Sequence, residues 1–190
     1  MKTPFPQTNR RILIIDDTPA IHADFRKILT PDTSGEADLN SLEQTLFGTR
    51  QAPHLAFQLD SAYQGQEALK LVQLALEQGR PYALAFTDMR MPPGWDGLET
   101  IERLWQADPH LQIALCTAYT DYSWEAMAER LEFGDQLLIL KKPFDALEIR
   151  QMANALTWKW QLAQDAALKM LNLEQTIEAR VHELLKVSHL

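Results

Sequence analysis

ILIIDD, residues 12–17, decides the fold of this chain: four apolar residues run directly into two aspartates. Three further apolar runs end in polar residues in the same way, namely YALAFTD (82–88), LQIALCT (111–117) and LLILKKP (137–143). Runs of this length, separated by helical patterns, indicate parallel strands that are buried on both faces. The carboxyl ends of parallel strands lie along one edge of a sheet, so the polar residues at these ends are expected to converge in one crevice.

The alternation of the two patterns predicts an α/β fold. Strands are expected at about Arg11–Asp16, His54–Leu59, Tyr82–Thr87, Gln112–Thr117 and Gln136–Leu140. Helices are expected to begin at Thr18, with Pro19 in the first position, near Gln64, at Asp96, near Ser123 and after Asp145. Five such units favour a flavodoxin-like, doubly wound parallel sheet with the strand order 2-1-3-4-5.

Two of these helix starts carry a further signal. Asp96 with Glu99, and Asp145 with Glu148, have the spacing of a capping box, in which the first and fourth residues satisfy each other's backbone N–H groups. We expect these two boundaries to be the best defined in the chain.

Length and composition limit the classes of function. A chain of 190 residues suggests one domain with an appendage, and a formal charge of −8 argues against a nucleic-acid-binding surface. No apolar run is long enough to span a bilayer, and the N-terminus lacks the apolar stretch of a signal peptide. The one cysteine, Cys116, is expected to be a small buried hydrophobe in a protein of the reducing cytoplasm.

The predicted crevice holds Asp16, Asp17, Asp88, Thr117 and Lys142. Two unit charges ~4 Å apart, at an effective dielectric constant of ~20, interact by ~4 kcal/mol, so the three carboxylates need a compensating cation. A hard divalent ion with oxygen ligands and retained water fits Mg²⁺ best. A carboxylate can also attack phosphorus to form an acyl phosphate, and Asp88 is the candidate acceptor.

At these residues the chain resembles the receiver domain of two-component response regulators. The resemblance rests on the acidic pair at 16–17, FTDMRMP (86–92), CTA (116–118) and KPF (142–144), which occur in the family's order. It covers roughly residues 10–155. It implies that Asp17, Asp88 and the backbone carbonyl of Arg90 bind Mg²⁺ directly, and that Asp16 acts mostly through water.

The same resemblance implies that Lys142 pairs with a phosphoryl oxygen and that the Thr117 hydroxyl turns to bond the new phosphoryl group. Lys141 competes for the role of Lys142, but the alternation of a strand sends its side chain to the opposite face. The position where the family commonly has Tyr or Phe, three residues before the conserved lysine, is Ile139. The switch is therefore expected to work without an inward-turning aromatic ring.

Two stretches depart from a minimal receiver. Residues 30–53 replace a short loop and contain a helical pattern, LNSLEQTLFG, that either packs on the flank of the domain or contacts a partner. MPPGWDG (91–97) is one residue longer than the family's usual loop, and Trp95 in it is expected to cover part of the site.

The chain from Ala146 to Leu190 contains no glycine or proline and follows one heptad frame. The two core positions are occupied by Ile149, Leu156, Ala163, Met170, Ile177 and Leu184, and by Met152, Lys159, Ala166, Leu173, Arg180 and Val187. A sustained apolar seam predicts a coiled coil, and a parallel homodimer is the simplest partner arrangement, with Lys159 and Arg180 weakening it locally. The alternative is a rod that folds back on its own domain or frays after Leu173.

The expected organisation is an N-terminal extension (1–9), a receiver (10–155) and a coiled-coil helix (156–190) that continues the last receiver helix. Trp158 and Trp160 are expected to pack where the rod leaves the globule. The tail LNLEQTIEARVHELL (171–185) looks like the connector that precedes histidine kinase or diguanylate cyclase modules. We therefore expect either an output domain after Leu190 or a coiled coil that is itself the output.

The sequence thus predicts a cytoplasmic phosphoacceptor that takes a phosphoryl group from a sensor histidine kinase or a phosphotransfer protein, and that is not itself an enzyme. One alternative is a scaffold that keeps the fold but is not phosphorylated. Another is a phosphatase of the haloacid dehalogenase type, which needs an aspartate two residues after its nucleophile. Thr18 and Arg90 stand at those positions after Asp16 and Asp88, so this pattern fails.

Overall fold

A computed structural model describes residues 8–30, 56–118 and 135–187 of the chain. Its elements, in chain order, are β1 (Arg11–Ile15), α1 (Pro19–Leu29), β2 (Gln58–Ala62), α3 (Gly65–Glu77), β3 (Leu84–Asp88), α4 (Gly97–Ala107), β4 (Gln112–Thr117), β5 (Leu137–Lys141) and α6 (Ala146–Val187). Within the described residues, none of the helices combines the length and the hydropathy that crossing a membrane requires.

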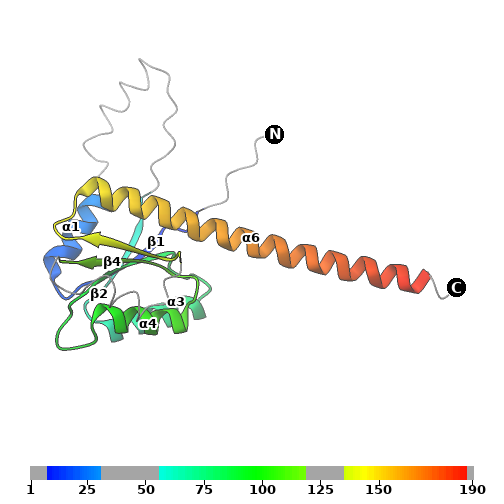
Figure 1. The fold of residues 1–190 in the computed structure, drawn as a ribbon, viewed down its shortest axis with the longest axis horizontal. Coiled ribbons are helices and arrows are strands. Elements are labelled where there is room, and N and C mark those ends of the chain that lie inside the picture. The colour runs from blue at the N-terminus through cyan, green and yellow to red at the C-terminus, as the bar shows by residue number, and fades with distance from the viewer. Residues whose placement is uncertain (1–7, 31–55, 119–134, 188–190) are drawn as a thin grey trace, which may run out of the picture.

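The five strands form one parallel sheet with the order β2-β1-β3-β4-β5, which confirms the predicted flavodoxin-like topology. Helices α1 and α6 cover one face of this sheet, while α3 and α4 cover the other (Figure 1). β2 is added on one side of β1 and β3 on the other, so the strand order reverses at β1, and the carboxyl ends of the parallel strands β1 and β3 lie side by side at the centre of the sheet.

Alternate residues of β1 pack into two apolar clusters, one on each face of the sheet. Ile12 and Ile14 lie in the apolar cluster shared with α1 and α6, whereas Leu13 and Ile15 lie in the cluster shared with α3 and α4. All four side chains are at most 1 % exposed. This explains why the strand is continuously apolar: it is buried on both faces, and side chains alternate between the faces.

The second strand lies later in the chain than predicted, and residues 54 and 55 of the predicted span are outside the described residues. The apolar run that begins at His54 suggested a strand at His54–Leu59, but β2 begins at Gln58 and ends at Ala62. It is an edge strand with one neighbour, so its residues from Gln58 to Ser61 are partly exposed and can be polar. Phe57, which lies inside the predicted span, precedes the strand and packs in the core under the guanidinium of Arg10.

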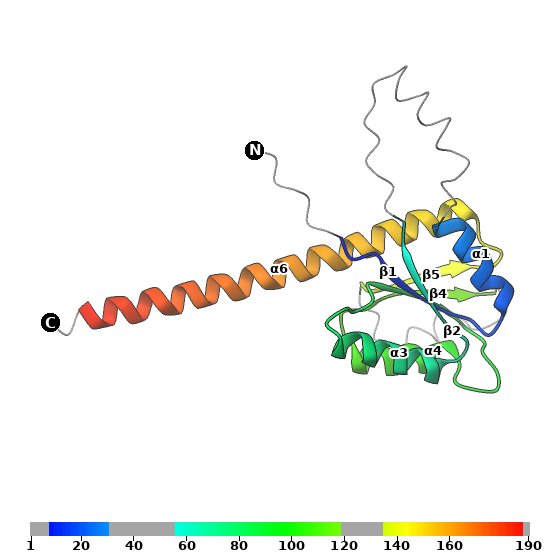
Figure 2. The same ribbon diagram turned by 180° about the vertical axis from the view of Figure 1, so that it is seen from behind.

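The remaining strand boundaries differ from the prediction by two residues or fewer, which is the usual uncertainty of element ends. The predicted helix near Ser123–Leu131 and most of the insertion at 30–53 lie outside the described residues. The last predicted helix is present as α6, a single helix of 42 residues that continues well beyond the sheet (Figure 2).

The two predicted capping signals hold, with a difference in detail. The Asp96 carboxylate accepts a hydrogen bond from the Glu99 backbone N–H (2.8 Å). At the start of α6 the Glu148 carboxylate accepts from the Asp145 backbone N–H (3.3 Å), while Asp145 itself accepts from Leu147 (2.6 Å). Thr18 was expected to cap α1, but its side chain makes no capping bond and donates to Asp17 instead.

The tryptophans at the exit of the rod behave differently from each other. Trp160 is buried, with 8 % of its surface exposed, as predicted for the junction between rod and globule. Trp158 was expected to pack there too, but 46 % of its surface is exposed. The two residues lie about 200° apart around an α-helix, so a helix that buries one on the domain turns the other outward.

Gly97 offers a test of how tightly α4 approaches β3. A Cβ atom at this position would lie 2.5 Å from the carbonyl oxygen of Asp88 and 2.8 Å from the Cα of Met89. Because both are backbone atoms, Gly97→Ala should force α4 away from the sheet and lower the free energy of unfolding by about 1–3 kcal/mol in urea titrations.

Gly94→Ala is the matched control. A Cβ there meets mainly the side chain of Gln64, which can move aside. Its unfolding free energy should stay close to that of the wild type, and equal losses in the two variants would contradict this account.

Candidate functional site

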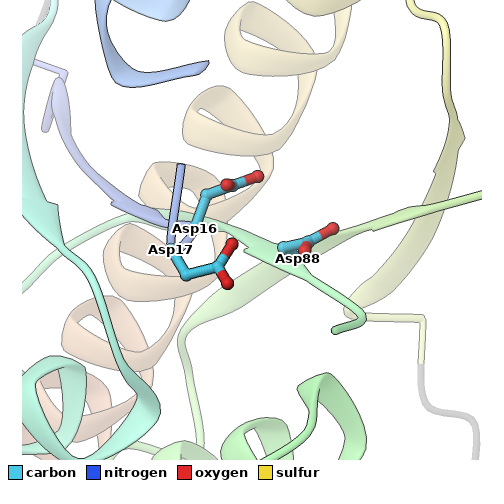
Figure 3. A group of neighbouring side chains, drawn as sticks. All are labelled: Asp16, Asp17 and Asp88. Carbon is cyan, nitrogen blue, oxygen red and sulfur yellow. The ribbon is translucent and has the colours of Figure 1, made fainter. Parts of the chain in front are cut away.

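Three carboxylates gather at the carboxyl edge of the sheet. Asp16 and Asp17 follow β1, and Asp88 ends β3, so the side-by-side placement of these strands brings the three together (Figure 3). One oxygen from each residue can be chosen so that all three lie within 4.8 Å of one another. The predicted convergence of strand-end residues is therefore present in the structure.

Lys142, which follows β5, reaches into this cluster. Its Nζ lies 2.8 Å from Oδ1 of Asp88 and 3.1 Å from Oδ2 of Asp16. The carboxylates are buried, with 4 % of the Asp16 and 12 % of the Asp88 side chain exposed, while Lys142 is 27 % exposed. Lys142 thus joins the carboxylates of two strands, and the prediction that it rather than Lys141 enters the crevice agrees with this geometry.

Backbone groups hold two of the carboxylates in place. The Thr18 N–H donates to Oδ1 of Asp16 at 2.8 Å, and the Arg90 N–H donates to Oδ2 of Asp88 at 3.3 Å. Each bond joins an aspartate to the residue two positions later, an arrangement that short acidic side chains favour at the end of a strand. The loops that leave β1 and β3 therefore orient the carboxylates that those strands deliver.

The negative charge of Asp88 is disfavoured in this cluster. Burial raises the pKa of Asp88 above its usual value of 3.8, and the charge of Asp16 raises it further, while Lys142 and the Arg90 N–H oppose the shift. For Lys142, burial lowers the pKa, but Asp88 and Asp16 more than offset this and leave it raised. One ammonium therefore compensates the carboxylates only in part.

The hydroxyl predicted for the site belongs to Thr117, the last residue of β4. Its side chain is 8 % exposed and donates to the carbonyl of Ala118 at 3.1 Å. Its own carbonyl accepts the backbone N–H of Lys142 (2.9 Å), so β4 and β5 end in register at the crevice. Ile139 of β5 is partly buried against the α3–α4 side of the core.

Cys116, one residue earlier in β4, is buried as predicted. Burial raises the pKa of its thiol, so the thiolate is disfavoured and the side chain acts as a small apolar group.

His22 is a residue of this region that the sequence patterns did not single out. It lies on the inward face of α1 with 3 % of its surface exposed, and its Nε2 is 2.7 Å from the backbone carbonyl of Asp16. The only available signal was its spacing, because Phe25 and Leu29 follow it at intervals of three and four on the buried face of the helix.

The donor set fits Mg²⁺. All the side-chain donors are carboxylate oxygens, two of the three carboxylates are largely removed from solvent, and their mutual repulsion is only partly relieved by Lys142. Hard divalent cations with oxygen ligands suit such a site, and sulfur or imidazole ligands that would favour Zn²⁺ are not part of the cluster.

The sequence profile of the response regulator receiver domain family matches residues 41–154, which is more than half of the chain. The chain therefore belongs to the response regulator receiver domain family. The matched segment begins after Asp16 and Asp17, yet the structure places β1, which carries them, between β2 and β3. Nothing among the curated proteins matches the chain.

Solved structures confirm the fold. A structure described as adenylate cyclase from Rhodopirellula baltica is 21 % identical, covers 85 % of this chain and 97 % of its own, and superposes with a TM-score of 0.61. The signal receiver domain of an HD domain-containing protein from Pseudomonas fluorescens Pf-5 is 17 % identical over 87 % of this chain and 98 % of its own (TM-score 0.61). A CheY-like receiver domain protein from Methanospirillum hungatei JF-1 is 19 % identical over 81 % and 98 % (TM-score 0.57).

The raised pKa of Asp88 predicts that this carboxylate destabilises the folded protein when it is ionised. In magnesium-free buffer at pH 7, Asp88→Asn should therefore unfold at a higher urea concentration than the wild type. The gain should shrink as the pH falls toward 3.8, because the wild-type carboxyl then takes up its proton in the folded state first.

The exposed Asp24 on α1 supplies the control variant, Asp24→Asn, which should leave the unfolding midpoint nearly unchanged. A stability gain for Asp88→Asn that grew on acidification would contradict the electrostatic account of the site.

Proposed function

We propose that this receiver accepts a phosphoryl group on Asp88 from a sensor histidine kinase or a phosphotransfer protein, in a reaction that needs Mg²⁺. The observation that carries the proposal is the contact of one ammonium, Lys142, with both Asp16 and Asp88 inside a cluster of three carboxylates. Buried carboxylates that are only partly paired cost stability, and a bound cation would offset this cost. A cytoplasmic location remains a prediction from the sequence.

In the proposed reaction a carboxylate oxygen of Asp88 forms a bond to phosphorus, and the bond from phosphorus to the donor's imidazole nitrogen breaks. The imidazole leaves with the proton that it carries, so Asp88 needs no general base. Phosphoryl transfer is accelerated mainly by positioning and by positive charge on the transferred oxygens. Asp88 meets the first need, because the Arg90 N–H and Lys142 hold its two oxygens in fixed directions.

Asp17, Asp88 and the Arg90 carbonyl would hold the metal directly, and Asp16 would act through water. A bound Mg²⁺ would supply positive charge to the carboxylates and to the transferred phosphoryl oxygens. Lys142 would exchange its contact with Asp88 for one with a phosphoryl oxygen while it keeps Asp16 as a partner. Its position between the two carboxylates makes this a short movement of a flexible side chain.

Thr117 would report the modification. Phosphorylation adds about −1.5 to −2 charges at pH 7, and the hydroxyl at the end of β4 would turn from the Ala118 carbonyl toward the new acceptor oxygens. Ile139 cannot reproduce the aromatic rotation common in the family, so we propose that the change passes through the β4–β5 edge into α6. A coupling of ~1–3 kcal/mol would suffice for a response.

Incubation with acetyl phosphate and Mg²⁺ should add the mass of one phosphoryl group to the intact protein. Asp88→Asn should abolish the addition, while Asp24→Asn, an exposed aspartate on α1, should leave it unchanged. Lys142→Ala should slow the reaction at least ~100-fold, because removal of one charge that stabilises a transition state typically costs that much.

The mass increase should also be lost on treatment with hydroxylamine, as expected of an acyl phosphate. If the wild type took up no phosphoryl group and Asp88→Asn behaved in the same way, a scaffold that is not phosphorylated would be the better account.

We also propose that the chain forms a homodimer through the exposed part of α6. The first heptads pack on the domain, where Ile149 is fully buried and Leu156 is 3 % exposed. Farther along, the same frame is exposed: Met170 by 64 %, Leu173 by 60 % and Ile177 by 53 %. A helix with an apolar stripe in water calls for a partner, and a sustained heptad repeat is self-complementary, so a second copy of this chain fits best.

The geometry of a straight α-helix shows how two copies can meet. A heptad stripe drifts by about 20° per heptad, so Ile177, four heptads after Ile149, points about 80° away from it. The stripe therefore leaves the face that packs on the sheet. We propose that two distal stripes pair alongside each other while each receiver stays clear of the shared axis.

Lys159 has a partner on the receiver domain itself. It was expected to weaken the coiled coil as a seam residue, but its Nζ pairs with the Asp135 carboxylate at 3.0 Å, next to β5. It belongs to the part of α6 that packs on the domain, so the dimer seam proposed here begins beyond it.

Ile177→Lys should convert the dimer to a monomer in sedimentation velocity runs on the whole chain, because it puts a charge into the proposed seam. Gln175→Lys adds the same charge on the opposite, outward side of the helix and should leave the dimer intact. A wild-type chain that sediments as a monomer at all concentrations would refute the dimer but not the phosphoacceptor role.

A further inference from the structure

The link from β1 to α1 is held by a histidine that approaches it from the helix. His22 lies one turn into α1, is 3 % exposed, and places Nε2 2.7 Å from the backbone carbonyl oxygen of Asp16. Its other ring nitrogen, Nδ1, is 3.0 Å from the hydroxyl of Ser61 in β2. The ring of Tyr63 packs against it with the ring centres 4.6 Å apart.

The directions of these hydrogen bonds follow from the groups involved. A carbonyl oxygen can only accept, so Nε2 of His22 carries a proton and donates to Asp16. The Arg26 guanidinium can only donate, and it donates to the Ser61 oxygen at 2.9 Å. The Ser61 hydroxyl proton is then free to donate to Nδ1. The hydrogen bonds therefore run in one direction, from Arg26 through Ser61 and His22 to the backbone carbonyl of Asp16.

That backbone group is the peptide that joins the two neighbouring carboxylates. The Asp16 carbonyl belongs to the same peptide plane as the Asp17 N–H, so a bond that fixes this plane restricts the directions of both side chains. This segment follows β1 and precedes α1. The Asp16 backbone N–H donates to the Ala62 carbonyl at 3.2 Å.

We propose that His22 is a positioning residue for the acidic site: it holds the Asp16–Asp17 peptide so that the carboxylates stay poised for a divalent cation. This inference rests on the proposed function, because it concerns the same magnesium site. His22 touches neither the cation nor the phosphoryl group in this account. It acts through the Asp16 carbonyl, and Ser61 and Arg26 select the ring tautomer that can donate there.

The test is calorimetric titration of the whole chain with MgCl₂, without any phosphodonor. His22→Leu keeps an apolar side chain of similar reach but removes the donor, and should weaken magnesium binding by ~10-fold, the usual effect of losing a group that orients a metal ligand. His22→Gln can place an amide N–H near the position of Nε2 and should restore most of the affinity.

A purely structural role would not show this pattern. Phe25→Leu is the control, because Phe25 is on the same helix and packs against Phe86 and Phe144 rather than against the site. It should lower the thermal midpoint and leave magnesium affinity unchanged. If His22→Leu does not fold, Ser61→Ala replaces it, since that variant removes only the group that selects the tautomer; it should weaken binding by a smaller factor.

Unchanged magnesium affinity in His22→Leu, or in Ser61→Ala where the former cannot be purified, would overturn the inference and leave the proposed function standing. Equal losses in His22→Gln and His22→Leu would also overturn it, because the donor would then be irrelevant. A wild-type protein that binds no magnesium would overturn the magnesium-dependent function and this inference together.

Discussion

The repulsion among three carboxylates at the carboxyl edge of the sheet is the constraint on which the rest of the site depends. Asp16 and Asp88 are held close to each other by the packing of β1 beside β3, and burial raises the pKa of Asp88, so its negative charge is disfavoured there. Lys142 relieves part of that cost by contacting both. Such a site is suited to an added positive charge, which the proposed phosphoacceptor role requires.

The surrounding residues keep the carboxylates from moving apart. The backbone N–H groups of Thr18 and Arg90 orient the carboxylates of Asp16 and Asp88. From α1, His22 contacts the backbone carbonyl of Asp16. Gly97 lets the start of α4 come against the backbone of Asp88 and Met89, so the loop after β3 has little room to relax. These contacts come from two loops and two helices, which means that the site is a property of the whole sheet edge rather than of any one loop.

Helix α6 links this edge to the rest of the molecule. Its first turns bury Ile149, Ala153 and Leu156 against the sheet, and its remainder carries an exposed apolar stripe. One continuous helix therefore has one end in the receiver core and an exposed apolar stripe beyond it. A change at β4 or β5 that tilted the packed end of α6 would also move its distal part, because the two are one helix.

The strand-end pattern was sufficient to predict the parallel sheet, its strand order and the meeting of three aspartates with Lys142, because strands buried on both faces must be apolar and their polar termini must meet at one edge. Local signals failed where burial is uneven: β2 is a half-exposed edge strand with a polar sequence, and His22 resembles any residue on the inner face of an amphipathic helix. Only the tertiary structure decided that Lys142 joins Asp16 to Asp88, that Lys159 pairs with Asp135, and that His22 ends on the Asp16 carbonyl. Such contacts join residues far apart in the chain, and their existence depends on distances set by packing, which no local pattern encodes.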